Sequence, residues 1–379
     1  MKTEATNPFR YGALALDDAF ADRESEIAEL AADIRNGQDV VVFAPRRYGK
    51  SSLIWAAARS LSQESVLVAQ VDLMTTPTKE RLAAALAGSI YEQIAFPLER
   101  VREKALAPFR GLSVSPTITI DPDGGSLSFS FGISARPDID ATLERLLELP
   151  AELGGARGRR TAIVLDEFQE VVDIDPDLPK LLRAVFQKQP EVSHVYLGSK
   201  RHVMERIFND TNEPFWRSAK PVELGPIGAE SFAPFVEARF HESGKAAEPA
   251  AVSALLQVTG GHPYATQELA YALWQQTAAG EAASTERLAR AVEAVLRSEN
   301  AHFSLLWEDA SGVQKLVLSA LAEEPGRPFT KAYRDRHDLP APTNVQKALG
   351  ALEKREVVAG QGGHYEIVEP FFADWLRRR

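Results

Sequence analysis

The clearest structural signal in the chain lies in residues 40–53, which read Val40-Val41-Val42-Phe43-Ala44-Pro45-Arg46-Arg47-Tyr48-Gly49-Lys50-Ser51-Ser52-Leu53. The first four residues form an apolar run, rich in valine and too short for a helix, which indicates a buried strand. Ala44 to Ser51 have the spacing G-x-x-x-x-G-K-[ST], with alanine at the first position. A helical pattern, Leu53 to Leu61, follows at once. A strand, a glycine-containing loop and a helix in this order predict a phosphate-binding loop.

The residue types of this loop suit a chain of phosphate groups. Phosphates need several converging backbone N–H donors, which a loop at a helix N-terminus supplies together with the helix dipole. Gly49 lets the backbone approach closely, Lys50 neutralises the β- and γ-phosphates, and the Ser51 hydroxyl ligates Mg²⁺. We therefore predict a nucleotide site, rather than a coincidental basic turn, at Ala44, Pro45, Arg46, Arg47, Tyr48, Gly49, Lys50, Ser51 and Ser52.

An acidic pair, Asp166-Glu167, follows the apolar segment Thr161 to Leu165. Open α/β sheets bind ligands at the carboxyl ends of their strands. Asp166 there can hold Mg²⁺ through water, and Glu167 can orient and deprotonate an attacking water. The alternative is a solvated acidic turn. Beside a phosphate-binding loop, the pair predicts catalytic roles for Asp166, Glu167 and Lys50, with Ser51 and Asp166 as metal ligands.

Two more polar residues are catalytic candidates. Ser199, in Gly198-Ser199-Lys200, lies at the carboxyl end of the expected strand Val192 to Leu197 and can contact the γ-phosphate or the attacking water. It can equally be the N-cap of a helix from Lys200 to Phe208. Arg217, in Pro214-Phe215-Trp216-Arg217, can sense the γ-phosphate or act as an arginine finger, or it can be an ordinary surface arginine. The sequence leaves both choices open.

Strand and helix patterns alternate up to Leu224, which predicts a parallel sheet covered on both faces. The other expected strands are Val66 to Val71, Ala162 to Leu165, Val192 to Leu197 and Pro221 to Leu224, and the clearest helices are Glu24 to Ile34, Lys79 to Ile94, Ile139 to Leu149 and Leu178 to Gln187. Ser113 to Ile133 is different, because apolar residues alternate with polar ones on both sides of Asp121-Pro122-Asp123-Gly124-Gly125. This segment predicts a β-hairpin with one apolar face.

Strand patterns stop after Gly225-Pro226. Four helices are expected next, at Ser231 to Phe240, Ala250 to Val258, Tyr264 to Thr277 and Thr285 to Glu308. The order of a winged helix follows: a helix Val313 to Glu323, a short segment Phe329 to Arg336, a helix Thr343 to Arg355 and a glycine-turn hairpin up to Val368. We expect Arg377-Arg378-Arg379 to be a frayed tail. We place the domain boundaries at 1–225, 226–309 and 310–379.

Composition excludes several classes of protein. The chain has 379 residues, a net charge of −10 and no cysteine, so disulfides and cysteine-based metal sites are excluded. The negative charge argues against a protein that mainly binds nucleic acid. No apolar run approaches the ~20 residues of a membrane span, and Met1 to Arg10 contain no apolar core of a secretory signal. A soluble, cytoplasmic protein is expected.

Several motifs together resemble one known family. They are Asn7-Pro8-Phe9, Phe20-Ala21-Asp22-Arg23-Glu24, Pro45 to Leu53, Leu165-Asp166-Glu167-Phe168-Gln169, Gly198-Ser199, Pro214 to Arg217 and Thr259-Gly260-Gly261-His262-Pro263. The combination is similar to the archaeal-type ATPase family, in the STAND branch of AAA+ P-loop NTPases. The resemblance implies an ATPase core with strand order 5-1-4-3-2, a helical lid and a winged helix. It also implies that Arg23, His262 and Pro263 lie near the adenine.

Three functions remain open on the sequence. The first is a switch ATPase that binds ATP and Mg²⁺, hydrolyses ATP slowly and acts through a partner protein or self-association, since no effector domain or repeat array is recognisable. The second is a DNA-binding ATPase, a replication-initiator-like protein or a transcriptional regulator, that uses the winged helix. Residues 312–379 carry an excess of only two positive charges, which is weak for a DNA surface. The third, a small-molecule P-loop kinase, is disfavoured by the acidic pair and the later helical lid.

Overall fold

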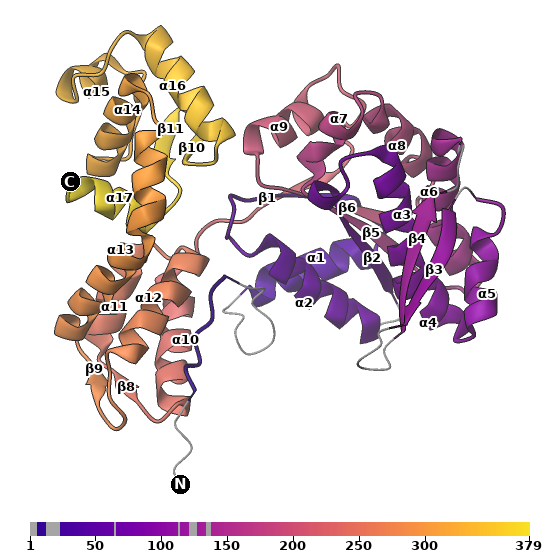
Figure 1. The fold of residues 1–379 in the computed structure, drawn as a ribbon, viewed down its shortest axis with the longest axis horizontal. Coiled ribbons are helices and arrows are strands. Elements are labelled where there is room, and N and C mark those ends of the chain that lie inside the picture. The colour runs from indigo at the N-terminus through magenta and orange to yellow at the C-terminus, as the bar shows by residue number, and fades with distance from the viewer. Residues whose placement is uncertain (1–5, 13–22, 64–65, 113, 121–126, 134–137) are drawn as a thin grey trace. The chain divides into compact units, whose positions relative to one another are not determined.

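The computed structural model describes residues 6–12, 23–63, 66–112, 114–120, 127–133 and 138–379 (Figure 1). Contacts group them into two compact units. The sheet unit consists of Glu24–Ala44 and Leu53–Leu224. The helical unit consists of the described residues up to Arg23, of Pro45–Ser52 and of Gly225–Arg379. Phe20 to Asp22, Ser113 and the turn Asp121 to Gly125 lie outside the described residues. The predicted boundaries at 225 and 309 stay predictions.

The sheet unit is built on a parallel sheet of five strands. They are β1 (Val40–Phe43), β2 (Leu67–Asp72), β5 (Thr161–Asp166), β6 (Val192–Gly198) and β7 (Lys220–Glu223), in the order β2-β5-β6-β1-β7. Because β3 and β4 belong to the hairpin, the five expected strands taken in chain order lie as 5-1-4-3-2. Strands β1, β5 and β6 are buried along their whole length. Their near-continuous apolar sequences follow from this burial on both faces.

Helices flank this sheet at the expected places. They are α1 (Glu24–Arg35), α2 (Lys50–Gln63), α3 (Lys79–Ile90), α6 (Ile139–Gly155), α8 (Leu178–Phe186) and α9 (Arg201–Asn209). A π-helical turn, Tyr91–Ala95, continues α3, and short helices follow at α4 (Phe96–Glu99), α5 (Arg102–Leu106) and α7 (Val171–Ile174). Alternate residues of the strands, such as Val41 and Ile163, share one apolar core with α3, α6 and α8. Because successive side chains of a strand point to opposite faces, the remaining strand residues lie on the other face of the sheet.

The predicted hairpin is present and packs on the sheet unit. Its strands β3 (Val114–Ile120) and β4 (Leu127–Ile133) are antiparallel, with Val114 opposite Ile133. Val114 and Phe131 are buried in the core that also contains α3. The Phe131 ring centroid lies 5.2 Å from that of Phe109 and 6.1 Å from that of Tyr91. This part of the apolar face is therefore covered within the chain itself, while the side chain of Phe129 lies outside the description.

Phe131→Ser is expected to lower the free energy of unfolding by about 3 kcal/mol, because it removes a buried ring and leaves a cavity. Urea denaturation measures the change. Phe96→Ser is the matched control, since that ring is 37% exposed and its loss costs less. An unchanged stability for Phe131→Ser, together with a loss of self-association, would instead make this face an interface between molecules.

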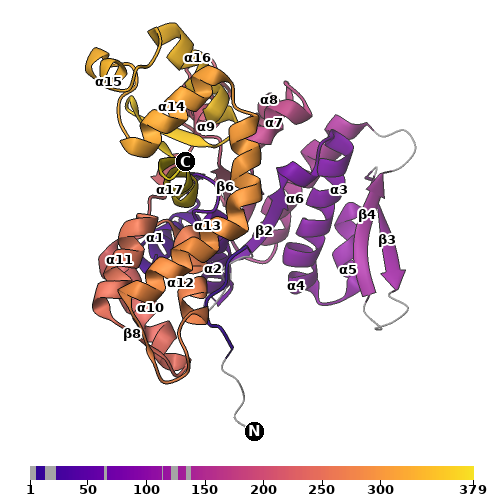
Figure 2. The ribbon, with the colours of Figure 1, turned by 60° about the vertical axis from the view of Figure 1, so that its left-hand side comes forward.

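The helical unit starts with the four expected helices, α10 (Ala229–Glu242), α11 (Pro249–Thr259), α12 (Pro263–Gln275) and α13 (Thr285–Glu308). A short parallel pair that the sequence did not indicate, β8 (Ala246–Ala247) with β9 (Ala282–Ala283), joins two of their connections. Figure 2 shows α13 running from this bundle to the winged helix. A single apolar core extends along it, from Phe9 and Phe240 in the bundle to Phe371 and Phe372.

The C-terminal part is a winged helix, as predicted. It consists of α14 (Gly312–Glu323), α15 (Lys331–Arg336), α16 (Pro342–Lys354), β10 (Val358–Gln361), β11 (His364–Ile367) and α17 (Pro370–Arg377). Strands β10 and β11 pair antiparallel across the glycine turn. Of the helices that the structure describes, none has the length and apolar character needed to cross a membrane.

The expectation of a frayed tail at Arg377 to Arg379 is wrong. Arg377 Nη1 donates to the carbonyl of Ala322 at 2.8 Å, and Arg378 Nη2 lies 2.8 Å from a carboxylate oxygen of Asp374. The Arg379 guanidinium lies over Trp307 and Trp375, 5.2 and 5.1 Å from their ring centroids. Ion pairs and cation–π contacts hold these arginines on the winged helix.

Candidate active site

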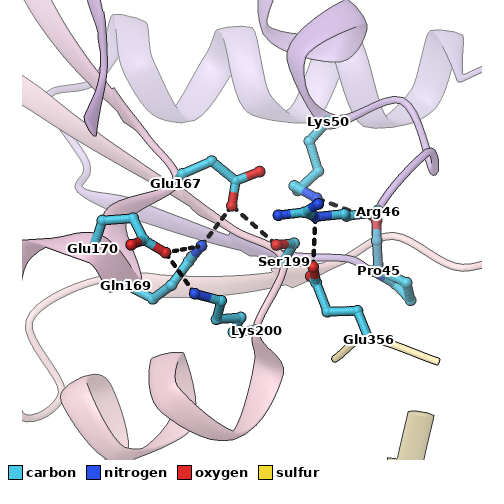
Figure 3. Close-up of polar contacts among 9 residues, drawn as sticks. All are labelled: Pro45, Arg46, Lys50, Glu167, Gln169, Glu170, Ser199, Lys200 and Glu356. Atoms are coloured by element: carbon cyan, nitrogen blue, oxygen red, sulfur yellow. Dashed lines mark hydrogen bonds and ion pairs between the residues drawn. The ribbon is translucent and has the colours of Figure 1, made fainter. Parts of the chain in front are cut away.

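The predicted phosphate-binding loop connects β1 to α2, and the helix starts at Lys50, three residues earlier than its sequence pattern indicated. Gly49 has φ +86° and empty space where a Cβ would lie, so the backbone conformation, rather than crowding, requires glycine there. Lys50 is only 6% exposed, and its Nζ donates to the carbonyl of Pro45 at 3.1 Å (Figure 3). The loop therefore curves around its own lysine.

The N-terminus of α12 packs on this loop. The Arg47 guanidinium lies over the Tyr264 ring, 4.2 Å from its centroid, and the Tyr48 ring meets the His262 imidazole edge-on at 4.6 Å. His262 is the N-cap of α12, its Nδ1 accepts from the backbone N–H of Ala265, and Pro263 opens the helix. The structure thus brings together the loop and the predicted residues His262 and Pro263.

His262 has a fixed proton arrangement. Burial, followed by the positive charge of Arg47, lowers the pKa of His262 to about 4. The imidazole is therefore neutral near pH 7, and because Nδ1 accepts a hydrogen bond, Nε2 carries the proton. This Nε2 is buried, and no described residue accepts a hydrogen bond from it.

Arg23 holds the start of the helical bundle. It is 4% exposed, has φ +89°, and donates from Nη2 to the carbonyl of Gly225 at 2.6 Å. Gly225 is the residue at which the chain leaves the sheet unit for α10. The expectation that Arg23 lies near the adenine of a bound nucleotide stays a prediction.

Asp166 is the last residue of β5 and Glu167 follows it, as predicted; Figure 3 shows the side chain of Glu167. Asp166 is buried, and one of its oxygens accepts from the backbone N–H of Glu167 at 2.9 Å. Glu167 has a left-handed backbone with φ +50°. Its Oε2 accepts two hydrogen bonds, from Ser199 Oγ at 2.9 Å and from Gln169 Nε2 at 2.5 Å. Two donors therefore fix the direction of the Glu167 carboxylate.

Ser199 belongs to this acidic cluster and does not cap a helix. The N-cap position of α9 is Lys200, with no side-chain cap, and the Ser199 hydroxyl donates to Glu167 instead. The capping alternative for Ser199 is therefore wrong. Ser199 follows β6 and Glu167 follows β5, and the two residues meet because these strands are neighbours in the sheet.

Three residues without a predicted role complete the cluster. Gln169 Nε2 reaches Glu167 and, at 3.5 Å, Glu170, which in turn accepts from Lys200 Nζ at 2.7 Å. Gly198 makes room for them, since a Cβ there would lie 2.8 Å from Gln169 Oε1 and 2.4 Å from Met204 Cγ. The sequence offered one signal for the role of Gln169, namely its position two residues after the acidic pair.

Arg217 occupies a different kind of position. Its backbone is left-handed with φ +49°, its side chain is exposed, and its guanidinium lies 5.5 Å from the ring centroid of Trp216. Trp216 is itself 45% exposed. A role of Arg217 at the γ-phosphate stays a prediction.

The predicted metal ligands fit Mg²⁺ better than a metal held by protein alone. Within the described part of the chain, no three His, Asp or Glu side chains are grouped so that they could hold an ion. Mg²⁺ keeps several waters and takes one or two protein oxygens besides substrate phosphates. A hydroxyl at the start of α2, from Ser51, and a carboxylate at the end of a buried strand, from Asp166, are oxygen donors of this kind.

A cluster of acids surrounds Arg47 in the helical unit. Burial, and then the charges of Glu299 and Glu369, raise the pKa of Glu268 to about 8, while Arg47 lowers it. Burial raises the pKa of Glu369 to about 7, and Arg47 is the largest opposing influence. One arginine thus faces several carboxylates that are kept from water.

Glu268→Gln is expected to flatten the pH dependence of stability. The folded-state pKa of Glu268 lies above its unfolded value, so the native state binds the extra proton and loses stability as pH rises from about 4.5 to about 8. Between pH 5 and pH 8 the wild type should lose on the order of 3 kcal/mol more than the variant. Urea denaturation at both pH values measures this difference. The exposed Glu286→Gln serves as control, and parallel curves for Glu268→Gln and wild type would contradict the expectation.

Two protein-family models match the chain. A model described as an ATPase domain predominantly from Archaea matches residues 20–269, and a model of a probable winged helix domain matches residues 301–378. No curated protein sequence matches the chain.

Among solved structures, the Walker-type ATPase of Pyrococcus abyssi is similar with a TM-score of 0.66 and 18% identity, over 96% of this chain and 97% of that one. The ORC1 protein of Aeropyrum pernix in complex with DNA has a TM-score of 0.50 and 17% identity, over 96% and 94%. The ADP form of the ORC2 protein of Aeropyrum pernix has a TM-score of 0.50 and 15% identity, over 98% and 97%. At these identities the likeness shows a shared fold.

Proposed function

Because the chain belongs to the family of ATPase domains found predominantly in archaea, we propose that it binds ATP and hydrolyses it slowly to ADP and phosphate. The observation that carries this proposal is the Glu167 carboxylate, which two hydrogen bonds orient at the end of β5. A general base must be held in place to take a proton from water as it attacks. An acid in a merely solvated turn has no need of two side-chain donors on one oxygen.

Each predicted residue has a part in this reaction. The backbone N–H groups of the loop and the Lys50 ammonium bind the phosphates, and Ser51 and Asp166 would hold Mg²⁺. Bound Mg²⁺ would neutralise charge that develops on the phosphates. Glu167 takes the proton of the attacking water, while Ser199 keeps that carboxylate in position. His262, Pro263 and Arg23 lie near the adenine ring of the bound nucleotide.

The slow rate and the switch role are also part of the proposal. An arginine finger accelerates phosphoryl transfer strongly. In the described part of the chain, the Arg217 guanidinium lies over the exposed Trp216 ring and makes no hydrogen bond to the Glu167 cluster. A regulated repositioning of Arg217 would raise the rate. The resemblance to the STAND branch supports action through a partner protein or a second copy.

A DNA-binding ATPase is the second candidate, and helix α16 favours it. The exposed residues of α16 include Thr343, Asn344, Gln346 and Lys347, and none of the exposed ones is acidic. Asn and Gln pair with adenine, and Lys with guanine, in the major groove. One similar structure, the Aeropyrum pernix ORC1 protein, is in complex with DNA. The small excess of positive charge in residues 312–379 argues against this candidate.

Phosphate release and duplex binding, measured on the same preparation, test both candidates. The switch function predicts low but measurable phosphate release that random duplex DNA does not change. The DNA-binding function predicts duplex binding that weakens linearly in log–log coordinates as salt rises and that responds to ATP. Lys347→Ala should then reduce the binding. Absence of phosphate release under all conditions would contradict the hydrolytic function.

A further inference from the structure

Two arginines of the phosphate-binding loop form ion pairs with the winged helix (Figure 3 shows the first). Arg46 Nε lies 2.5 Å from Glu356 Oε2, and Arg47 Nη1 lies 3.4 Å from Glu369 Oε2. Glu356 stands between α16 and β10, and Glu369 is the N-cap of α17. The two acids thus come from both ends of the β10–β11 hairpin. We call these contacts the arginine–glutamate pairs.

The two sides of these pairs differ in burial. The side chains of Arg46 and Arg47 are 50% and 47% exposed, whereas those of Glu356 and Glu369 are 12% and 20% exposed. The glutamates are part of the packed winged helix, and the arginines project from a loop. An arginine with a long, half-exposed side chain can turn to another anion more readily than a packed carboxylate can move.

The arginine is the hydrogen-bond partner of only one oxygen of each glutamate. Oε2 faces the arginine in both cases, and Oε1 of Glu356 is buried and accepts no hydrogen bond from the described residues, whereas the Glu369 carboxylate also meets the backbone N–H of Phe371. A buried carboxylate oxygen without a donor costs free energy. The Arg46–Glu356 pair therefore forms at a cost, which lowers its net stabilisation and lets a competing anion draw Arg46 away.

We propose that Glu356 and Glu369 are positioning residues of the nucleotide site, which hold Arg46 and Arg47 on the winged helix and compete with bound phosphates for them. The proposal rests on the proposed ATP binding by this loop. The winged helix thereby responds to nucleotide: the more negative the bound phosphate chain, the weaker its hold on the loop.

The direction of the effect follows from charge and from reciprocity. ATP carries more negative charge on its phosphates than ADP, so it attracts the two arginines more strongly away from the glutamates. If nucleotide weakens the pairs, removal of the pairs must strengthen nucleotide binding by the same factor. The gain must be larger for ATP than for ADP, which distinguishes this role from simple structural support.

The test is the double variant Glu356→Gln/Glu369→Gln of the full chain, titrated with ATP and with ADP. ATP affinity should rise about 5- to 10-fold, within the usual range of coupling between sites, and ADP affinity less. Asp335→Asn, which removes one exposed acid from α15 of the same winged helix, is the control and should change neither affinity. A second cycle repeats the glutamate changes in an Arg46→Lys/Arg47→Lys background, which keeps the positive charges; there the gain should shrink because lysine pairs less specifically.

Each outcome has one meaning. Equal ATP affinities for wild type and double variant, with both proteins folded, overturn the proposal and leave the nucleotide site intact. A lowered melting temperature with reduced or equally changed affinities for both nucleotides assigns the pairs to structural support and also overturns it. A wild type that binds neither ATP nor ADP contradicts the proposed function itself, and the coupling with it.

Discussion

Lys50→Ala is expected to lower ATP affinity about 100-fold, equivalent to about 3 kcal/mol. In the proposed site this ammonium is the side-chain charge that reaches the β- and γ-phosphates, and its 6% exposure means that the phosphates would meet it with little water between. The hydrogen bond from Lys50 Nζ to the Pro45 carbonyl is an interaction that bound phosphate can replace. Isothermal titration with ATP measures the loss.

The control for Lys50→Ala must separate binding from folding. Lys180→Ala removes an equally charged side chain that is exposed on α8, and it should leave affinity unchanged. Thermal melting of each variant without nucleotide shows whether the fold is kept. A folded Lys50→Ala variant with near-normal affinity would remove this loop from the nucleotide site.

Glu167→Gln is expected to leave ATP binding intact and to slow hydrolysis by a factor of about 10² to 10⁴, the usual contribution of a general base. Both hydrogen bonds to Glu167 end on the same oxygen, Oε2. A glutamine amide can place its oxygen there and keep both donors, from Ser199 and Gln169. The substitution therefore preserves the geometry and removes only the ability to take a proton. Steady-state phosphate release at saturating ATP measures the effect.

An exposed neighbour provides the comparison for Glu167→Gln. Asp173→Asn removes a carboxylate from α7, close in sequence but exposed, and should keep full turnover. Full turnover in Glu167→Gln as well would place the base elsewhere, at Asp166 or on a group that a partner supplies.

Short-range patterns were enough to predict much of the fold and to choose the residues at the centre of the candidate site. The loop from Ala44 to Ser51, the acid at Glu167 and the hairpin each depend on residues that are neighbours in sequence, so spacing and alternation identify them. The order of the strands came from the family resemblance, because alternation of strands and helices does not fix which strands are neighbours.

Contacts between residues that are far apart in the chain could not be predicted from sequence patterns. Ser199 has the same sequence signal as a helix cap, and only the pairing of β5 with β6 brings its hydroxyl to Glu167. The tail at Arg379 looked frayed because Trp307, which it contacts, lies far earlier in the chain. Arg46 and Glu356 likewise carry no local pattern that joins them.

The place of Phe9 has a consequence for how the protein is made. Its ring packs 5.3 Å from that of Phe240, in the apolar core of the helical unit, and the whole sheet unit lies between them in sequence. A ribosome that adds 5–20 residues per second needs roughly 10 to 50 s for the residues that separate the two rings. The core that contains both rings cannot close before then. During synthesis, the chain from Glu24 to Leu224 therefore emerges complete while Phe9 is still without its partner.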